Sequence, residues 1–453
     1  MNPLQNCKNI YFIGIGGIGM SALARYFNKQ RLVVSGYDKT PTLLTDALIK
    51  EGIQIHFEDD LTKIDKQASV IVYTPAIPSN HGELNYFKEN GYLVVKRSDV
   101  LQWITENAFT IAIAGTHGKT TTTSMTAHIL RHTGYGCNAF LGGIASNYGT
   151  NFWSHEKNVV VVEADEYDRS FLKLAPNIAV ITAVDPDHLD IYGTAEEVVK
   201  AFGEFSDKIK TGGWLIRKWN TVFNTLESNK TILTYDYSND KASFHPQHIK
   251  VVDGSYQFDL VHPLGVCKDI MLPMGGLHNV ENVSAAIAIA LTLKIDEVKI
   301  KEAVACFKGV KRRFEFKIKT SNKVLIDDYA HHPEELNALI SGVRSLYPNE
   351  KMVLVFQPHL YSRTKDQCEG FVETLDKADE VILLPIYPAR ELPIEGVSSE
   401  MLLSKMKLNH KKLMSKEELY AWAASTKDKL IVMAGAGDID VCILKVQEIL
   451  NPS

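Results

Sequence analysis

Cysteine is sparse in this sequence of 453 residues, and no two cysteines form a C-x-x-C pair. The six cysteines lie far apart along the chain, at positions 7, 137, 267, 306, 368 and 442. Disulfide frameworks and cysteine-based zinc motifs need characteristic spacings, so neither is expected. We expect buried or unbridged thiols in a reducing compartment.

Long apolar runs and an excess of positive charge are also missing. No uninterrupted apolar run approaches the ~20 residues that span a bilayer, and the N-terminus lacks a basic segment followed by an apolar core. The formal net charge is −5, and the basic cluster at 311–313 is short. These absences argue against membrane and nucleic-acid partners and predict a cytoplasmic protein.

Internal repeats and low-complexity tracts are absent, and the length suggests about three domains. Short apolar runs alternate with helix-like stretches, which is typical of parallel sheets covered by helices on both faces. We therefore expect an α/β fold with functional residues directly after the strands. The runs lie at 10–13, 32–34, 70–73, 111–114, 159–162, 178–182, 324–326, 352–356, 381–384 and 430–433.

We place three domains at 1–107, 108–309 and 310–453. The third begins at a basic hinge, 309–314, that precedes a fresh series of strands. Residues 212–275 contain several glycines and are expected to be β-rich, as an excursion within the central domain.

The stretch 109–121 carries the most chemical information. An apolar strand ends in Gly-Thr-His-Gly-Lys-Thr-Thr, and a helix is expected from Ser124 to Leu130. Backbone N–H groups and a helix N-terminus in such a turn face nucleotide phosphates, Lys119 reaches the β- and γ-phosphates, and Thr120 or Thr121 can hold Mg²⁺. The loop is shorter than the common Gly-x-x-x-x-Gly-Lys-Thr pattern.

A second glycine turn follows the first strand. Residues 14–19 fit Gly-x-Gly-x-x-Gly ahead of a helix expected from Met20 to Asn28, and Asp38 ends the next strand. The turn suits a pyrophosphate, and the carboxylate suits a ribose or a base. On its own this motif also fits a dehydrogenase or a plain strand-to-helix turn.

Acidic residues follow two strands of the expected central sheet. Glu163 directly ends one strand, and a cluster with His188 follows another. Mg²⁺ on a nucleotide needs a few hard oxygen ligands, so these groups are candidates for a magnesium site. Asp185, Asp187 and Asp190 belong to the cluster with His188, and Asp165 follows Glu163. Asp165 and Asp190 also fit solvated loop carboxylates.

Two amides precede an expected helix at 283–293. Asn279 and Asn282 are three residues apart and would share one face of a first helical turn, where each could read the edge of an adenine. Asn279 also fits a helix N-cap, and both interpretations can hold together.

Polar clusters follow two strands near the C-terminus, at 327–333 and 357–364. An arginine pairs bidentately with a carboxylate, so Arg363 suits a carboxylate-bearing substrate. His332 and His359 fit packing or capping roles as well as catalytic ones.

These motifs together resemble the Mur ligases, and the resemblance covers essentially the full length in order. It implies three α/β domains: an N-terminal Rossmann-like domain for a UDP-sugar, a central P-loop ATPase-like domain with a mostly parallel sheet for ATP and Mg²⁺, and a C-terminal Rossmann-like domain that brings the amino acid. It further implies that L-alanine is joined to the lactyl carboxylate of UDP-N-acetylmuramate through an acyl phosphate, in peptidoglycan precursor synthesis, as the domains close.

The resemblance also implies roles for individual residues. Those expected to act catalytically are Lys119, Glu163, His188, Arg313, Asp328 and His331. Those expected to bind the nucleotide are Gly115, Thr116, His117, Gly118, Lys119, Thr120, Thr121, Asn279, Asn282 and Arg312. Those expected to bind the other substrates are Gly14, Gly16, Gly17, Gly19, Asp38, Tyr329, His331 and Arg363. Thr120, Glu163 and His188 are expected to hold the metal.

The sequence departs from the family pattern at four places. Leu360 stands where these ligases often have an arginine, which bears on the choice of amino acid. Ala183, Met274-Gly275 and Ala330 also differ from the usual residues and look like packing variants.

Three alternatives stay open. One is a family member that attaches a recycled murein tripeptide to the same UDP-sugar. The second is a nicotinamide oxidoreductase built on the first glycine turn, and the third is a catalytically silent nucleotide-binding protein. We expect a monomer or a weak homodimer.

Overall fold

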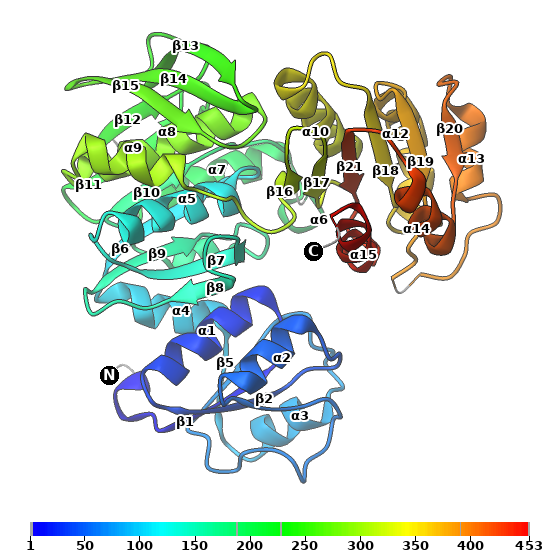
Figure 1. Ribbon diagram of the computed structural model, residues 1–453. Coiled ribbons are helices and arrows are strands. Elements are labelled where there is room, and N and C mark those ends of the chain that lie inside the picture. Colours follow the sequence, from blue (N-terminus) through cyan, green and yellow to red (C-terminus); the bar gives the residue numbers. More distant parts are fainter. Residues whose placement is uncertain (1–2, 187–188, 227–228, 390, 452–453) are drawn as a thin grey trace. The chain divides into compact units, whose positions relative to one another are not determined.

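The computed structural model describes residues 3–186, 189–226, 229–389 and 391–451. The chain forms two compact units, and Figure 1 shows the α/β architecture of each. The first unit comprises 1–248, 258–271 and 280–307, and the second comprises 249–257, 272–279 and 308–453. Within the described part of the chain, no helix combines the length and the apolar character needed to cross a bilayer.

The N-terminal sheet is entirely parallel, with strand order β3-β2-β1-β4-β5. The order reverses between β1 and β4, and ligands of open α/β sheets bind at such a switch point. Its elements are β1 (Asn9–Ile13), α1 (Ile18–Lys29), β2 (Val33–Tyr37), α2 (Leu43–Lys50), β3 (Gln54–His56), β4 (Val70–Tyr73), α3 (Gly82–Glu89), β5 (Leu93–Lys96) and α4 (Arg97–Glu106).

The central sheet has the order β12-β11-β10-β6-β9-β7-β8, and only its β7–β8 pair is antiparallel. Strand β6 lies between β9 and β10, so the loops that follow these three strands meet at one edge. The elements are β6 (Phe109–Ala114), α5 (Lys119–His132), β7 (Asn138–Ala145), β8 (Thr150–Trp153), β9 (Val159–Glu163), β10 (Ile178–Ile181), α6 (Leu189–Tyr192), α7 (Ala195–Ser206), β11 (Gly213–Lys218) and β12 (Lys230–Tyr235).

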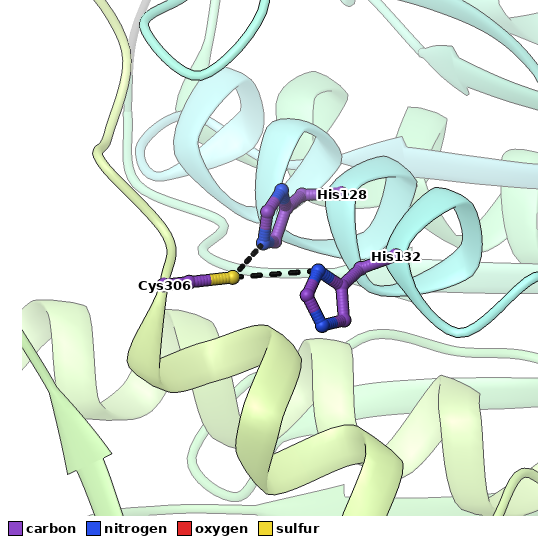
Figure 2. Close-up of side chains that lie close together, drawn as sticks. All are labelled: His128, His132 and Cys306. Atoms are coloured by element: carbon purple, nitrogen blue, oxygen red, sulfur yellow. Dashed lines mark hydrogen bonds between the residues drawn. The ribbon is translucent and has the colours of Figure 1, made fainter.

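The segment 212–275 is β-rich, as expected, but it is not a single excursion within the central domain. Strands β11 and β12 belong to the central sheet, and residues 249–257 and 272–275 belong to the second unit. Strands β13 (His245–Val252), β14 (Ser255–His262) and β15 (Gly265–Leu272) form a three-stranded sheet, and helices α8 (Leu277–Thr292) and α9 (Glu297–Ala305) follow. The end of α9 lies beside the end of α5, where His128, His132 and Cys306 come together (Figure 2).

The C-terminal sheet has the order β16-β17-β21-β18-β19-β20, and only β16–β17 is antiparallel. Strands β17, β21 and β18 are neighbours, so the polar segments that follow them also share an edge. The elements are β16 (Glu315–Lys319), β17 (Val324–Asp328), α10 (Pro333–Leu346), β18 (Met352–Phe356), α11 (Tyr361–Asp366), α12 (Cys368–Leu375), β19 (Glu380–Leu383), α13 (Ser399–Lys405), β20 (Lys411–Leu413), α14 (Lys416–Ser425), β21 (Leu430–Ala434) and α15 (Ile439–Leu450).

Helix α1 begins two residues earlier than the sequence predicts, at Ile18, and two other helices begin earlier by a full turn or more. Helix α5 begins at Lys119 instead of Ser124, because Gly118 adopts φ +80° and allows the chain to turn directly into the helix. Helix α8 begins at Leu277, so Asn279 lies inside the first turn and the N-cap interpretation is wrong.

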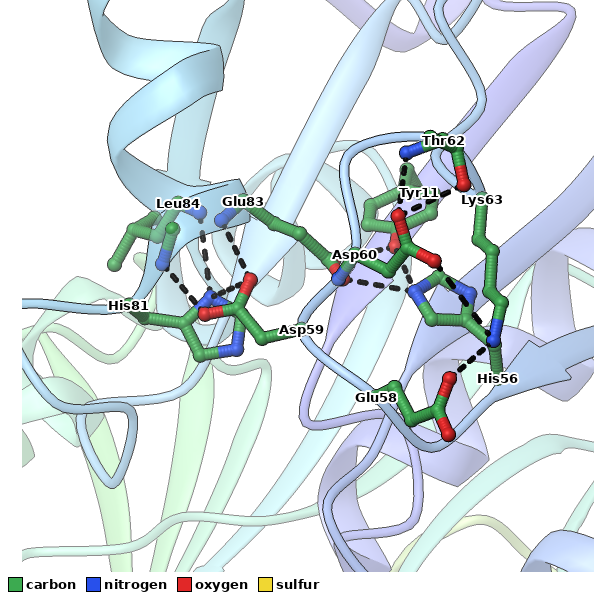
Figure 3. Close-up of polar contacts among 11 residues, drawn as sticks. Tyr11, His56, Glu58, Asp59, Asp60, Thr62, Lys63, His81, Glu83 and Leu84 are labelled. Atoms are coloured by element: carbon green, nitrogen blue, oxygen red, sulfur yellow. Dashed lines mark hydrogen bonds and ion pairs between the residues drawn. The ribbon is translucent and has the colours of Figure 1, made fainter.

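A buried carboxylate organises the polar interior of the N-terminal domain. Glu83 is 0% exposed and accepts hydrogen bonds from the Tyr11 hydroxyl at 2.6 Å and the Asp60 N–H at 3.2 Å. Its Oε1 also lies 2.8 Å from His56 Nε2 (Figure 3). Burial and the charge of Glu83 raise the pKa of the Tyr11 hydroxyl, so Tyr11 stays a donor.

We expect Glu83→Ala to lower the free energy of unfolding by about 2–5 kcal/mol, because buried donors lose their acceptor. Glu83→Gln should lose less, since its amide oxygen still accepts from Tyr11. Urea unfolding measures both changes. The matched control is Glu58→Ala, whose pair with Lys63 is exposed, and it should leave stability nearly unchanged. Equal effects of Glu58→Ala and Glu83→Ala would contradict this role.

Candidate active site

The loop between β6 and α5 is shaped by two glycines with positive φ. Gly115 has φ +134°, and a Cβ there would overlap Thr182 Oγ1; Gly118 has φ +80°, and a Cβ would lie 2.7 Å from Asn282 Oδ1. The Thr182 hydroxyl donates to the carbonyls of Ala114, at 3.1 Å, and His117. The loop is therefore held by its neighbours, with the first amides of α5 at its end, as an anion site requires.

Lys119 is the first residue of α5, and its side chain forms hydrogen bonds across the preceding loop. Its ammonium donates to the Gly115 carbonyl at 2.7 Å and to Glu166 Oε1 at 2.6 Å. The Glu166 side chain is 1% exposed, and burial raises the pKa of its carboxyl in spite of Lys119. Sequence reasoning did not find this partner, because only the pairing of β6 with β9 brings it to the loop.

Thr120 and Glu163 lie together at the start of α5, as the sequence predicts. The Thr120 hydroxyl donates to Glu163 Oε1 at 3.0 Å, and the Gly142 N–H donates to Oε2 at 3.1 Å. A hydroxyl beside a carboxylate offers the hard oxygen atoms that Mg²⁺ prefers. The third expected metal residue, His188, lies with Asp187 outside the described residues.

The remaining loop residues contact the segment after β10. The Thr116 N–H donates to the Ala183 carbonyl at 3.1 Å, and the Thr116 hydroxyl lies 3.3 Å from Asp185 Oδ2. His117 Nε2 is 3.8 Å from the same carboxylate, and Thr121 is buried in the first turn of α5. Because Ala183 contributes only its backbone here, its departure from the family pattern leaves this contact intact.

The two amides of α8 have different partners. Asn282 is buried and its Oδ1 accepts from the Thr122 hydroxyl of α5 at 3.2 Å, so it lies next to the loop helix. The Asn279 amide donates to the Gly275 carbonyl at 2.7 Å within the second unit. Asn282 therefore lies in the first unit beside the phosphate-type loop, whereas Asn279 closes the turn before its own helix.

The first glycine turn has the expected form. The carboxylate of Asp38, which was expected to bind a ribose or a base, accepts hydrogen bonds from backbone N–H groups instead. Gly14 has φ +86°, and the Gly17 N–H donates to its carbonyl at 3.2 Å. The Gly16 N–H donates to Asp38 Oδ2 at 2.7 Å, and the Thr40 N–H donates to Oδ1 at 3.2 Å. Asp38 thus stabilises the turn itself.

A cavity of about 290 Å³ opens near this turn. A Cβ on Gly19 would lie 2.8 Å from Arg97 Nη1, and Arg97 Nη2 is 3.8 Å from Asp165. Its lining combines cations and carboxylates from both sheets of the first unit: Thr74, Pro75, Ala76, Lys96, Arg97, Ser98, Asp165, Tyr167 and Asp168. We did not predict Lys96 and Arg97, although a Lys-Arg-Ser step at the end of an apolar run was a usable signal.

In the second unit, two arginines lie over one tyrosine ring. The guanidinium carbons of Arg312 and Arg313 are 5.1 Å and 5.6 Å from the Tyr329 ring centre. Arg312 has φ +61° and also reaches the Gly435 carbonyl and Asp327, the latter at 3.5 Å. The basic hinge is therefore fixed to the strand ends of β17 and β21.

Two adjacent aspartates end β17, of which Asp327 is buried and Asp328 is partly exposed. Burial raises the pKa of Asp327 to about 7, against the opposing effect of Arg312. Burial also raises the pKa of Asp328, whose oxygens accept from the N–H groups of Phe314 at 2.7 Å and Ala330 at 2.8 Å. Asp328, an expected catalytic residue, thus holds the surrounding loops in the described structure.

A histidine cluster lies beside these residues. Burial lowers the pKa of His331 to about 4, although Glu335 lies 3.2 Å from its Nδ1 and acts in the other direction. The His331 ring centre is 5.1 Å from that of Tyr329, and Arg363 Nη1 is 3.4 Å from His359 Nδ1. The expected residues Tyr329, His331 and Arg363 therefore share one region.

Leu360 has an uncommon backbone conformation at this site. Its φ is +70° at the residue before α11, and its N–H donates to the Tyr387 carbonyl at 2.9 Å. A leucine with positive φ carries backbone strain, and such strain concentrates at functional sites. The position of the missing family arginine is thus the residue directly before α11, the helix that carries Arg363.

Three family models match consecutive parts of the chain. They are the Mur ligase family catalytic domain over residues 9–108, the Mur ligase middle domain over 113–290, and the Mur ligase glutamate ligase domain over 312–437.

Similar proteins match over the full length. A UDP-N-acetylmuramate–L-alanine ligase from Flavobacterium johnsoniae is 46% identical over 99% of both chains, and one from Porphyromonas gingivalis is 47% identical over 98% of this chain and 99% of its own. The solved UDP-N-acetylmuramate–alanine ligase from Thermotoga maritima matches with a TM-score of 0.83 at 27% identity, covering 98% of this chain and 99% of its own. A murein peptide ligase from Psychrobacter arcticus shares the fold, with a TM-score of 0.69 at 21% identity and coverage of 98% and 99%.

The three α/β domains place polar groups after the ends of parallel strands, which is where open α/β sheets bind their ligands. With these matches in every domain, the chain belongs to the Mur ligase family, whose members are ATP-dependent ligases. The expected three-domain fold is confirmed.

The contact between Lys119 and Glu166 leads to a stability prediction. We expect Lys119→Ala and Glu166→Gln to show a coupling of about 1–3 kcal/mol in a double-mutant cycle of urea unfolding, because each leaves the other group buried without its partner. The exposed pair Lys200–Glu197 should show no measurable coupling and serves as the control.

The effect should also depend on pH in a defined direction. A carboxyl whose folded-state pKa is raised stabilises the fold at low pH and loses that contribution as pH rises through its pKa. Removing Lys119 raises the pKa of Glu166 further, so Lys119→Ala should destabilise the protein less at about pH 5 than at about pH 8. A destabilisation that is constant with pH would contradict the pairing.

Proposed function

We propose that this protein joins L-alanine to the lactyl carboxylate of UDP-N-acetylmuramate with hydrolysis of ATP to ADP and phosphate, as a step of peptidoglycan precursor synthesis. The observation that carries the proposal is the meeting, at one edge of the central sheet, of Lys119 and Thr120 at the start of α5 with Glu163 at the end of β9. The full-length similarity to UDP-N-acetylmuramate–L-alanine ligases supports the choice of substrates.

The proposed domains divide the substrates among them, with bounds at 1–107, 108–309 and 310–453. The first would bind the UDP-sugar through the turn of Gly14, Gly16, Gly17 and Gly19, and the central domain would bind ATP. The cavity beside Arg97 supports the first assignment, because Lys96 and Arg97 offer cations for a diphosphate or a carboxylate. The third domain would bind the amino acid through Tyr329, His331 and Arg363.

The residues present fit a magnesium ion at Thr120 and Glu163. Their oxygen atoms are 3.0 Å apart, and hydroxyl and carboxylate oxygens are ligands that Mg²⁺ accepts. Bound there, Mg²⁺ would neutralise charge on a transferring phosphoryl group. We keep His188 as a third proposed ligand from the family resemblance.

The chemistry requires activation of a poor acylating agent. The lactyl carboxylate oxygen attacks the γ-phosphorus of ATP and ADP leaves, which produces an acyl phosphate. The free amine of L-alanine then attacks the acyl carbon, the nitrogen loses a proton, and phosphate leaves. Lys119 would stabilise the phosphoryl charge, which requires it to exchange its bond to Glu166 for one to phosphate.

The second unit offers groups suited to the amine half of the reaction. His331 is neutral because its pKa is lowered to about 4, and Asp327 exchanges its proton near neutral pH. Arg363 would pair with the amino-acid carboxylate, and Arg312 or Arg313 with nucleotide phosphates. A cytoplasmic location and a monomeric or weakly dimeric state stay predictions.

The deciding experiment measures ADP release with UDP-N-acetylmuramate, Mg²⁺ and ATP while single amino acids are exchanged for a murein tripeptide. We expect release with L-alanine and little with the tripeptide. Lys119→Ala should abolish release while UDP-N-acetylmuramate still binds. Release only with the tripeptide would favour the murein peptide ligase, and no release with any acceptor would overturn the proposal.

Glu163→Gln tests the metal assignment. The amide keeps the shape and the Thr120 contact but loses the negative charge, so the Mg²⁺ concentration for half-maximal ADP release should rise about tenfold or more. Glu156→Gln, an exposed change in the same domain, should leave the titration unchanged. Superimposable titrations of Glu163→Gln and the parent protein would remove Glu163 from the metal site.

A further inference from the structure

Three metal-ligating side chains meet at the far end of the loop helix. His128 and His132 are four residues apart on α5 and therefore share one face, and Cys306 follows the last residue of α9 (Figure 2). Cys306 Sγ lies 3.5 Å from His128 Nε2 and 3.4 Å from His132 Nδ1. All three residues belong to the first unit.

The distances match those that a tetrahedral zinc ion imposes on its ligands. With Zn–S of about 2.3 Å and Zn–N of about 2.05 Å, sulfur and nitrogen ligands are about 3.6 Å apart. Both sulfur–nitrogen distances are close to this value, and all three ligand atoms lie within 4.8 Å of one another. His132 and Cys306 are exposed, so their side chains can adjust while His128 stays fixed.

The surroundings of His128 fix the orientation of its ring. His128 is 2% exposed, and each of its ring nitrogens has a hydrogen-bond partner. Its Nδ1 lies 2.8 Å from the Tyr148 hydroxyl. When Nδ1–H donates to Tyr148, Nε2 is left as the ligand atom, which is the usual arrangement behind a metal-bound histidine.

A hydrogen-bonded arrangement competes with metal binding. His128 Nε2 lies 2.8 Å from the Ala303 carbonyl, and Cys306 Sγ lies 3.4 Å from the same oxygen. With Nε2 protonated, the cluster is a set of hydrogen bonds that closes the end of α9. A metal ion would replace these hydrogen bonds with bonds to Nε2 and a thiolate and would release protons.

We propose that His128, His132 and Cys306 form a binding site for a borderline-soft divalent cation such as Zn²⁺, which fastens the end of α5 to the end of α9. Two imidazoles and a thiolate select this class of ion over Mg²⁺, which prefers oxygen ligands. A fourth position is left for water or another ligand, as in three-ligand zinc sites.

The site is separate from the phosphate-type loop. His128 and His132 lie nine and thirteen residues after Lys119, which places them about 14–20 Å further along α5. The ion would therefore act on the anchoring of the helix that begins with Lys119. We did not predict this site from the sequence, because its ligands lie on α5 and directly after α9, far apart in the sequence, and form no recognisable spacing.

The test uses the full chain after chelator treatment, with excess Mg²⁺ present to occupy oxygen sites. Isothermal titration with ZnCl₂ should show one tightly bound ion per chain, and CoCl₂ should produce a thiolate-to-cobalt charge-transfer absorption. Cys306→Ser should abolish that absorption and weaken zinc binding at least about 100-fold. Tyr148→Phe should weaken zinc binding about 10- to 100-fold while keeping the absorption.

Cys7→Ser is the matched control, because Cys7 is also incompletely buried but lies outside the cluster, and it should bind zinc like the parent protein. Circular dichroism and Mg²⁺-dependent ADP release without zinc establish that Cys306→Ser is folded. Absence of a stoichiometric zinc ion, or equal affinity in the parent and Cys306→Ser, would show that the three side chains are only hydrogen-bonded.

Discussion

Parallel pairing of β6 with β9 and β10 is the constraint on which the central site depends. Parallel strands end at the same edge, so a glycine loop, a carboxylate and a threonine that are far apart in sequence must meet there. The close approach of Thr182 to Gly115 and of Asn282 to Gly118 leaves no room for a side chain at these two positions of the loop. The conformation of the loop therefore depends on the order of the strands, and a different strand order would separate the residues of the site.

Cationic side chains have partners within each unit. In the first unit Lys119 is paired with the nearly fully buried carboxylate of Glu166. In the second unit Arg312 and Arg313 lie over the Tyr329 ring. A buried ion pair gains little net stability, because desolvation offsets the attraction between the charges. Its value here is positional, since it holds the lysine next to the loop carbonyl of Gly115.

Much of the architecture was predictable, because buried parallel strands are continuous apolar runs that need no knowledge of the tertiary fold. The start of α5 was not, since the threonines at 120–123 have weak helix propensity and become helical through packing. Motif spacing identified Lys119, Thr120 and Glu163, whereas the pairing of Glu166 with Lys119 became visible only once strand order was known. Arg97 was missed although the sequence offered a signal for it. The engagement of Asp38 by Gly16 is a backbone contact that no pattern of residue types encodes.

The two ends of helix α5 have opposite electrostatic polarity. Its aligned peptide groups form a macrodipole with partial positive charge near Lys119 and partial negative charge near His132. An anion at the first turn and a cation beyond the last turn are each favoured by this polarity. Occupation of one end by phosphate and of the other by a metal would thus align both ligands with the same internal field.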